Sequence, residues 1–242
     1  PPPPTAQVLQ TLDHNLFIDC GEGTQLQMRN YTIRRTKINH IFISHLHGDH
    51  YFGLIGLLTS LGLNHRVNDL HIYSPPALKE IIDLQFKVSK DSRPYGLFFQ
   101  ALESEEIIFE DKKISVECFK VCHRIECFGF LFREKKNLRK IDSKKINKYN
   151  IPSTFYESLH EGKDFISEKN EIIKNEWVTN AARPPRSYAF CADSCYFEDL
   201  VEKINGDDLL YHESTYLPEL EVKAISRYHS TDRQGAMIEK KA

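Results

Sequence analysis

The sequence lacks the features of a membrane protein or an exported protein. Its 242 residues contain no apolar run near the roughly 18 residues that cross a bilayer, and no signal-peptide pattern. An excess of one charge is also missing, since 32 Lys and Arg face 34 Asp and Glu, which gives a net charge of −2. This balance excludes a protein whose whole surface binds polyanions, so any nucleic-acid site has to be a local patch. We therefore expect a soluble, globular protein.

Cysteine pairs of the CxxC type and internal repeats are absent as well. A chain of this length can bury a stable core without disulfides, and nothing in it indicates secretion. We therefore expect free thiols in a reducing cytoplasm, although three disulfides in an exported protein and a cysteine-only metal site stay open. The six cysteines are Cys20, Cys118, Cys122, Cys127, Cys191 and Cys195. Because residues 1–4 lack an initiator Met and the chain stops within a helical run, we also expect incomplete termini.

Short apolar or alternating runs rich in β-branched and aromatic residues predict strands. These runs cover residues 15–19, 40–44, 70–73, 114–121, 128–132, 188–191 and 209–212. Helical spacing of apolar residues instead marks residues 51–63, 76–88, 195–203 and 231–241. Pro76 suits the first turn of the second helix, and Ser230 with Thr231 can cap the last one. This mixture predicts a core of two sheets with helices outside.

One stretch, residues 131–150, differs in charge from the rest of the chain. It holds eight basic residues against two acidic ones. We interpret it as part of an inserted arm, residues 133–165, on a single domain that spans residues 1–242. The alternative is a solvated amphipathic helix with Leu138, Ile141 and Ile146 facing inward, and both interpretations can hold together.

The most informative motif is HLHGDH, directly after a predicted strand. Three imidazoles and a carboxylate in six positions cannot all be buried without partners. Alternation in extended backbone sends His45 and His47 to one side, where a single ion can bind both. Gly48 lets the chain turn sharply, after which Asp49 and His50 can face a second ion. These ligand types suit Zn²⁺, with Mn²⁺ or Fe as alternatives, whereas a solvated histidine-rich loop would bind no metal.

Further ligands have to come from elsewhere in the chain, because a metal ion needs three or four. His123 follows a predicted strand, whose end can present the imidazole to a site, or it is a hydrogen-bonded structural residue. Asp193 follows a buried strand and can reach into a crevice, or it caps the helix predicted to begin at Cys195. Both residues are therefore candidate ligands with a structural alternative.

Together these motifs resemble the metallo-β-lactamase-fold hydrolases. The run FIDCGEGTQ, residues 17–25, is similar to the signature of one branch, the ribonuclease Z family, whose members trim the 3′ ends of precursor tRNA. The later motifs follow in the order of that family: HR at 123–124, CADS at 191–194, HEST at 212–215 and HST at 229–231. The resemblance spans essentially the whole chain and implies an α/β (α+β) fold, the four-layer αββα sandwich.

The resemblance also implies a dinuclear zinc site, with Mn²⁺ or Fe as alternatives to Zn²⁺. His45, His47 and His123 would hold one ion, and Asp49 and His50 the other. Asp193 would bridge the two ions. A water shared by the two ions would lose a proton to Asp49, and the resulting hydroxide would attack the phosphodiester.

The later motifs are implied to complete the reaction. His229, oriented by Glu213, would protonate the leaving 3′ oxygen of the tRNA. Asp19 would steady a ligand imidazole. Each has a structural alternative: His212 and Glu213 as a hydrogen-bonded pair at a strand end, His229 as a neighbour of a helix start, and Asp19 as a carboxylate of a turn.

The basic arm suits tRNA, because clustered positive charge attracts phosphates irrespective of sequence. Its candidate substrate-binding residues are Lys135, Lys136, Arg139, Lys140, Lys144 and Lys145. The resemblance implies a homodimer in the cytoplasm, with precursor tRNA as partner and neither a membrane nor DNA. The Gly-Pro element usual in such an arm is not evident, and IPSTFY at 151–156 occupies its place.

The resemblance therefore implies a zinc-dependent endoribonuclease that removes the 3′ trailer from precursor tRNA and leaves a tRNA 3′-hydroxyl. One alternative is a hydrolase of a small phosphodiester or (thio)ester, which the same dinuclear site would serve. The other is a catalytically inactive RNA-binding homologue. The family's last metal-binding histidine, in a His-Phe-Ser-like segment, would lie downstream of residue 242, and its true absence would favour that second alternative.

Overall fold

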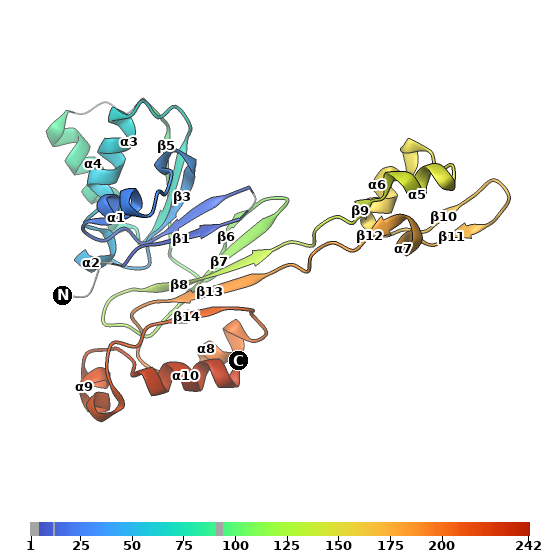
Figure 1. Ribbon diagram of the computed structural model, residues 1–242. Helices are drawn as coiled ribbons and strands as arrows, with labels where there is room; N and C mark the ends of the chain where they lie inside the picture. Colours follow the sequence, from blue (N-terminus) through green and yellow to red (C-terminus); the bar gives the residue numbers. More distant parts are fainter. Residues whose placement is uncertain (1–4, 12, 91–93) are drawn as a thin grey trace. The chain divides into compact units, whose positions relative to one another are not determined.

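The computed structural model describes residues 5–11, 13–90 and 94–242 (Figure 1). The first four residues, taken above as an incomplete terminus, lie outside the described residues. The chain divides into two compact units. Unit 1 comprises Pro1–Asp111, Ser115–Phe132 and Ser187–Ala242, and unit 2 comprises Lys112–Ile114 and Arg133–Arg186. Within the described residues, no helix is both long enough and apolar enough to cross a membrane.

The first sheet contains five strands in the order β1-β2-β3-β4-β5. Its strands are β1 (Gln7–Gln10), β2 (Asn15–Ile18), β3 (Ile38–Phe42), β4 (Leu70–Ser74) and β5 (Leu97–Ala101). β1 pairs antiparallel with β2, and β2 to β5 pair in parallel. Parallel strands need both faces covered, which fits the buried apolar residues on both faces of β2, β3 and β4.

The second sheet also contains five strands, in the order β14-β13-β8-β7-β6. Its strands are β6 (Glu106–Glu110), β7 (Ile114–Lys120), β8 (Phe128–Glu134), β13 (Ser187–Cys191) and β14 (Leu210–His212). β6 pairs antiparallel with β7, and β13 pairs in parallel with β14. Seven predicted strands are thereby confirmed, while β1, β5 and β6 were not predicted.

Aromatic side chains pack the two sheets of unit 1 face to face. The ring of Phe42, on β3, lies 5.6 Å from the ring of Phe130 and 5.4 Å from that of Phe132, both on β8. All three rings are fully or almost fully buried. Aromatic residues bury much apolar surface each, so this cluster holds the sheets together.

Helices cover the outer faces of both sheets. α1 (Thr24–Asn30), α3 (Leu54–Leu63) and α4 (Ala77–Ser89) bury their apolar faces on the first sheet, and α8 (Asp199–Ile204) and α10 (Asp232–Lys241) on the second. Short elements between them are α2 (Gly48–Tyr51), η1 (Arg35–Lys37), η3 (Pro218–Leu220) and α9 (Glu221–Ser226). The predicted four-layer αββα arrangement is confirmed.

The helix boundaries differ from the predictions at two places. The helix predicted over 51–63 begins only at Leu54, as α3, because Tyr51 ends the separate short helix α2. The helix predicted from Cys195 begins only at Asp199. The predicted cap of the last helix is confirmed, because the Thr231 hydroxyl accepts a hydrogen bond from the Gln234 amide while the Gln234 side chain accepts one from the Thr231 amide.

Unit 2 has a small core of its own. Its elements are β9 (Lys140–Ile141), α5 (Ser143–Lys148), η2 (Ser153–Phe155), α6 (Tyr156–Glu161), β10 (Phe165–Ile166), β11 (Ile172–Ile173), α7 (Asn175–Val178) and β12 (Thr179–Asn180). β9 pairs with β12 and β10 with β11, both antiparallel. Buried aliphatic side chains fill the centre: Ile146, Ile151, Leu159, Ile173 and Val178.

The predicted arm, residues 133–165, lies within unit 2, which continues to Arg186. A single amphipathic helix through Leu138 and Ile146 was the wrong alternative. The Asp142 carboxylate caps α5 by accepting from the amides of Lys144 and Lys145, so the helix starts only after β9. Ile146 is buried as expected, whereas Leu138 is 58% exposed.

Candidate metal centre

The loop after β3 and the helix α2 that follows it carry four of the predicted ligands, two each. β3 ends at Phe42, and α2 begins at Gly48. His45 is fully buried, and His47 is half-buried just before the helix. The prediction that Gly48 makes a sharp turn was wrong, because this glycine occupies the first position of α2. An added Cβ there would lie 2.3 Å from the exposed Phe52 ring, so a larger residue would require this ring to move.

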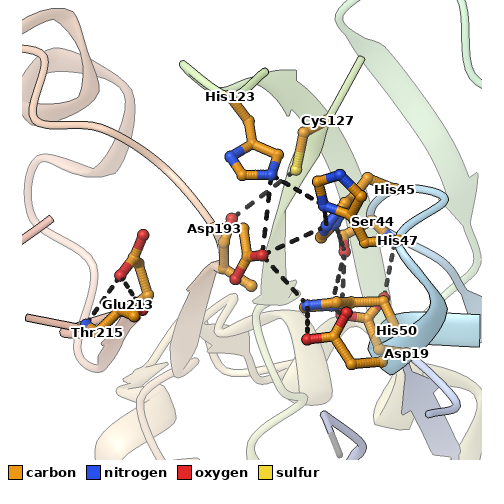
Figure 2. A network of polar contacts seen from close by, with 12 residues as sticks. Asp19, Ser44, His45, His47, His50, His123, Cys127, Asp193, Glu213 and Thr215 are labelled. Carbon is orange, nitrogen blue, oxygen red and sulfur yellow. Dashed lines mark hydrogen bonds and ion pairs between the residues drawn. The ribbon is translucent and has the colours of Figure 1, made fainter. Parts of the chain in front are cut away.

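Four donor atoms from three segments converge beside this loop (Figure 2). His47 Nδ1 lies 3.0 Å from His45 Nε2 and 3.1 Å from His123 Nε2. Asp193 Oδ2 lies 3.4 Å from His45 Nε2 and 3.8 Å from His123 Nε2. All four donors lie within 4.8 Å of one another.

These separations fit a tetrahedral cation site. Ligand bonds of about 2.0 to 2.2 Å to Zn²⁺ place neighbouring tetrahedral donors about 3.3 to 3.6 Å apart. The four measured separations, from 3.0 to 3.8 Å, bracket that range. Three imidazoles and a carboxylate are also a donor set that suits Zn²⁺. The cluster therefore has the composition and the spacing of a metal site, and the fold and these residues together indicate metal binding.

The other two predicted ligands also lie near Asp193. His50 Nε2 lies 3.4 Å from Asp193 Oδ2 and 3.7 Å from Asp49 Oδ2. His50 is buried, whereas the side chain of Asp49 is 67% exposed. The same oxygen of Asp193 therefore approaches His50 as well as the cluster of His45, His47 and His123, an arrangement that suits a bridging carboxylate.

The charges of the cluster follow from burial and from its own contacts. Burial, with help from neighbouring His45 and His123, lowers the pKa of His47 to about 4, so this ring is neutral near pH 7. Burial opposes ionisation of Asp193, but hydrogen bonds with His45 and His50 hold its pKa well below the usual range. Burial also opposes protonation of His50, yet Asp19 and Asp193 raise its pKa to about 10. A cation at His50 would therefore displace a proton.

Asp19 orients Ser44, in the loop after β3, and His50, in α2. Its carboxylate accepts from the Ser44 amide at 2.8 Å, from the Ser44 hydroxyl at 2.9 Å and from His50 Nδ1 at 2.7 Å. Asp19 is fully buried and has a φ of 56°, just past the end of β2. The bond to Nδ1 leaves Nε2 of His50 facing Asp193. A carboxylate that fixes an imidazole in this way is typical of the surroundings of metal sites.

His123 reaches the cluster from the loop after β7. Its Nδ1 donates to the carbonyl of Tyr228 at 2.9 Å, which directs Nε2 toward His47. The structural and the ligand interpretation of His123 are therefore compatible. Asp193 does not cap a helix, because α8 begins at Asp199, so that alternative was wrong. The neighbouring Arg124 is exposed, and its Nη2 lies 2.9 Å from Nε2 of His47.

Glu213 links three segments next to the cluster. Its carboxylate accepts from His229 Nδ1 at 2.8 Å, from the amides of Ser194 and Ser230 at 3.0 and 3.2 Å, and from the Thr215 amide and hydroxyl at 3.0 and 2.6 Å. The bond to Glu213 raises the pKa of His229. The ring of His229 lies 5.2 Å from that of His123, so the predicted pair lies beside the candidate ligands.

The prediction of six free thiols was wrong. Cys122 and Cys195 form a disulfide, while Cys20, Cys118, Cys127 and Cys191 are free and buried. The two bonded cysteines are 73 residues apart, and a pairing of that kind leaves no spacing signal in a single sequence. Ser44, Ser194 and Thr215 were likewise not predicted, because each acts through a contact that only the folded chain creates.

The predicted substrate-binding residues are all in unit 2. Lys136, Lys140, Lys144 and Lys145 are exposed, and Lys135 and Arg139 are partly buried. Arg139 Nε donates to the Thr179 hydroxyl at 2.8 Å, so this guanidinium also holds unit 2 together. Lys145 lies 3.6 Å from Asp142.

Comparison with known proteins adds independent findings. A family model described as "Anti-Pycsar protein Apyc1" matches residues 5–158. A ribonuclease Z of Bacteroides thetaiotaomicron is 39% identical over 236 residues, covering 97% of this chain and 75% of the relative. A ribonuclease Z of Cytophaga hutchinsonii is 41% identical over 246 residues, covering 98% and 77%.

Solved structures show the same fold. The short form of human tRNase Z has a TM-score of 0.69 and 24% identity, covering 98% of this chain and 81% of that chain. The metallo-β-lactamase-fold protein YhfI of Bacillus subtilis has a TM-score of 0.64 and 17% identity, covering 98% and 73%.

Proposed function

Because the chain belongs to the ribonuclease Z family and, through residues 5–158, to the family described as anti-Pycsar protein Apyc1, we propose that it is an endoribonuclease. Its reaction is removal of the 3′ trailer from precursor tRNA by hydrolysis of one phosphodiester, which leaves a tRNA 3′-hydroxyl. The observation that carries this proposal is the convergence of His45, His47, His123 and Asp193, whose donor atoms lie within 4.8 Å of one another.

Two divalent cations per chain, with Zn²⁺ the best match to the donors, belong to the proposal. His45, His47 and His123 would hold one ion, and Asp49 and His50 the other, with Asp193 shared between them. When bound, such ions supply an activated water and stabilise the negative charge on phosphate oxygens. The distances around Asp193 Oδ2, from 3.4 to 3.8 Å, support this division of the ligands.

The remaining steps are assigned to proton carriers of the chain. Asp49 accepts the proton of the attacking water, for which its exposed carboxylate is accessible. His229 donates a proton to the leaving 3′ oxygen. Its bond to Glu213 fixes the ring and favours the protonated form that a general acid needs.

Cleavage of a precursor tRNA tests the function directly. The protein should cut a transcript that carries a 3′ trailer, lose this activity after dialysis against a chelator, and regain it with Zn²⁺. Cleavage is measured on gels, and metal content by elemental analysis. Undiminished cleavage by metal-free protein would contradict the proposal. Hydrolysis of a small phosphodiester with no cleavage of the transcript would favour the small-substrate alternative.

Unit 2 is proposed as the arm that binds the body of the tRNA. Four of its six candidate residues, Lys136, Lys140, Lys144 and Lys145, present exposed positive charge. Clustered lysines attract phosphates without reading a sequence, which suits an enzyme acting on many tRNAs. The small core of unit 2 supplies a folded support for these charges.

Replacing Lys135, Lys136, Lys144 and Lys145 by alanine should weaken tRNA binding and spare hydrolysis of a small phosphodiester. Each lost phosphate contact should reduce the slope of log affinity against log salt by about one. Filter binding over a salt series measures both effects. The matched control replaces four exposed lysines of unit 1: Lys37, Lys79, Lys87 and Lys240. Equal tRNA affinity of the two variants would contradict the assignment of the arm.

The homodimer and the cytoplasmic location implied by the resemblance stay predictions within this proposal. The same holds for precursor tRNA, rather than DNA, as the nucleic-acid partner.

A further inference from the structure

A disulfide joins the two loops that supply His123 and Asp193. Cys122 immediately precedes His123, and Cys195 lies two residues after Asp193. The amide of Cys195 also donates to the carbonyl of Cys122 at 2.7 Å. A covalent bond therefore connects the backbones of both loops within two residues of a candidate ligand on each side.

The sheet alone does not set the distance between these loops. His123 follows β7 and Asp193 follows β13, and β8 lies between these two strands in the second sheet. β7 and β13 are therefore not hydrogen-bonded neighbours. The two loops meet beyond the first residue of β8, where the disulfide and the hydrogen bond from the Cys195 amide hold them together.

The spacing of the loops matters for a cation. His45 and His47 are two residues apart on one loop, but His123 and Asp193 each come from a separate loop. Metal ligands have to stand within a few tenths of an ångström of their bonding distance. Asp193 has a φ of 43°, a left-handed conformation that aspartate adopts more readily than most residues but that still costs some energy, so contacts that hold its loop are useful.

We propose that the Cys122–Cys195 disulfide positions His123 and Asp193 for cation binding, so that its reduction lowers the affinity of the cluster for a divalent cation. The proposal rests on the proposed function only in that the cluster binds a metal. The two cysteines act through the ligands and are positioning residues.

The redox step uses a dithiol as reductant. One thiolate of the dithiol attacks a sulfur of the disulfide, the bond between Cys122 and Cys195 breaks, and a mixed disulfide forms. The second thiol of the reductant then releases the protein. The dithiol is oxidised to a disulfide, and its two hydrogens end on the two protein thiols. Cys122 and Cys195 are partly exposed, whereas the four free cysteines are buried, which limits exchange to this pair.

The affinity for Zn²⁺ tests the proposal without any RNA. Oxidised and reduced wild-type protein are titrated against a chromophoric chelator under anaerobic conditions. Reduction should weaken Zn²⁺ binding by about 10- to 100-fold, the range found when residues that orient ligands are altered. The visible absorption of the Co²⁺-loaded protein should change in parallel, because it reports the geometry of the ligands.

The double variant Cys122→Ser, Cys195→Ser should match the reduced wild type and no longer respond to the dithiol. The control Cys118→Ser, a buried free cysteine that bonds the carbonyl of Ser104, should respond like the wild type. The reduced wild-type protein has the natural sequence, so the test does not depend on whether the double variant folds. Equal affinity of the oxidised and reduced forms, or six free thiols in unreduced protein, would overturn the proposal. Redox-dependent Zn²⁺ binding by a protein that does not cleave precursor tRNA would instead contradict the proposed function and leave this proposal supported.

Discussion

Replacing Asp49 by alanine is expected to abolish cleavage of precursor tRNA while leaving the fold intact. Loss of a general base alone lowers a rate by about 10²- to 10⁴-fold. Loss of the proposed cation ligand would add to this, since Asp49 Oδ2 lies 3.7 Å from His50 Nε2. The side chain is 67% exposed, so its removal leaves no cavity in the core. Single-turnover cleavage and thermal denaturation measure the two effects.

Asp199→Ala is the matched control for this variant. Asp199 is also exposed and also lies in the first turn of a helix, α8, so its loss removes the same favourable charge at a helix start. The control should cleave at the wild-type rate. Cleavage by Asp49→Ala close to that rate would refute the role of Asp49 in the reaction.

Replacing His229 by alanine is expected to slow cleavage of precursor tRNA by about 10²- to 10⁴-fold, the usual contribution of a general acid. The leaving 3′ oxygen of an RNA is a poor leaving group without a proton. The leaving group of a nitrophenyl phosphodiester is nitrophenolate, a stable anion that needs no proton. The same variant should therefore hydrolyse that small substrate at nearly the wild-type rate, and parallel loss on both substrates would rule out the role of general acid.

The same residue predicts a pH dependence. The bond to Glu213 raises the pKa of His229, so the protonated acid persists to higher pH than for a free imidazole. The cleavage rate should fall as the pH rises through this raised pKa. Glu213→Gln removes the negative charge and should move that alkaline decline to lower pH. A decline at unchanged pH would show that another group limits the rate, and circular dichroism checks the fold of the variant.

The loop after β3 was predictable because its chemistry is local. Residues 45–50 place four polar side chains in one short run, and the preceding apolar strand fixes where that run begins. Its long-range partners were only candidates, since nothing in one sequence states that His123 and Asp193 approach His47. Their roles came from the order of the motifs, and the structure supplies the distances of 3.0 to 3.8 Å among the donors.

Elements with weak local patterns were not predicted from the sequence. α1 consists mostly of polar residues, and it is held by Thr24 and Met28, whose burial depends on the first sheet. The start of α8 was misplaced because the segment from Cys195 is restrained by its disulfide before the helix begins. Glu213 was named, but its five hydrogen bonds to three segments could not be foreseen, since the order of the motifs does not state which donors approach its carboxylate.

The separate origins of the ligands constrain the order of events during folding. His45 and His47 follow a strand of the first sheet, whereas His123 and Asp193 follow strands of the second. No nascent chain can present all four donors until both sheets have come together. A cation that needs all four donors would therefore bind the native state more tightly than the unfolded chain, and would raise the native population by mass action.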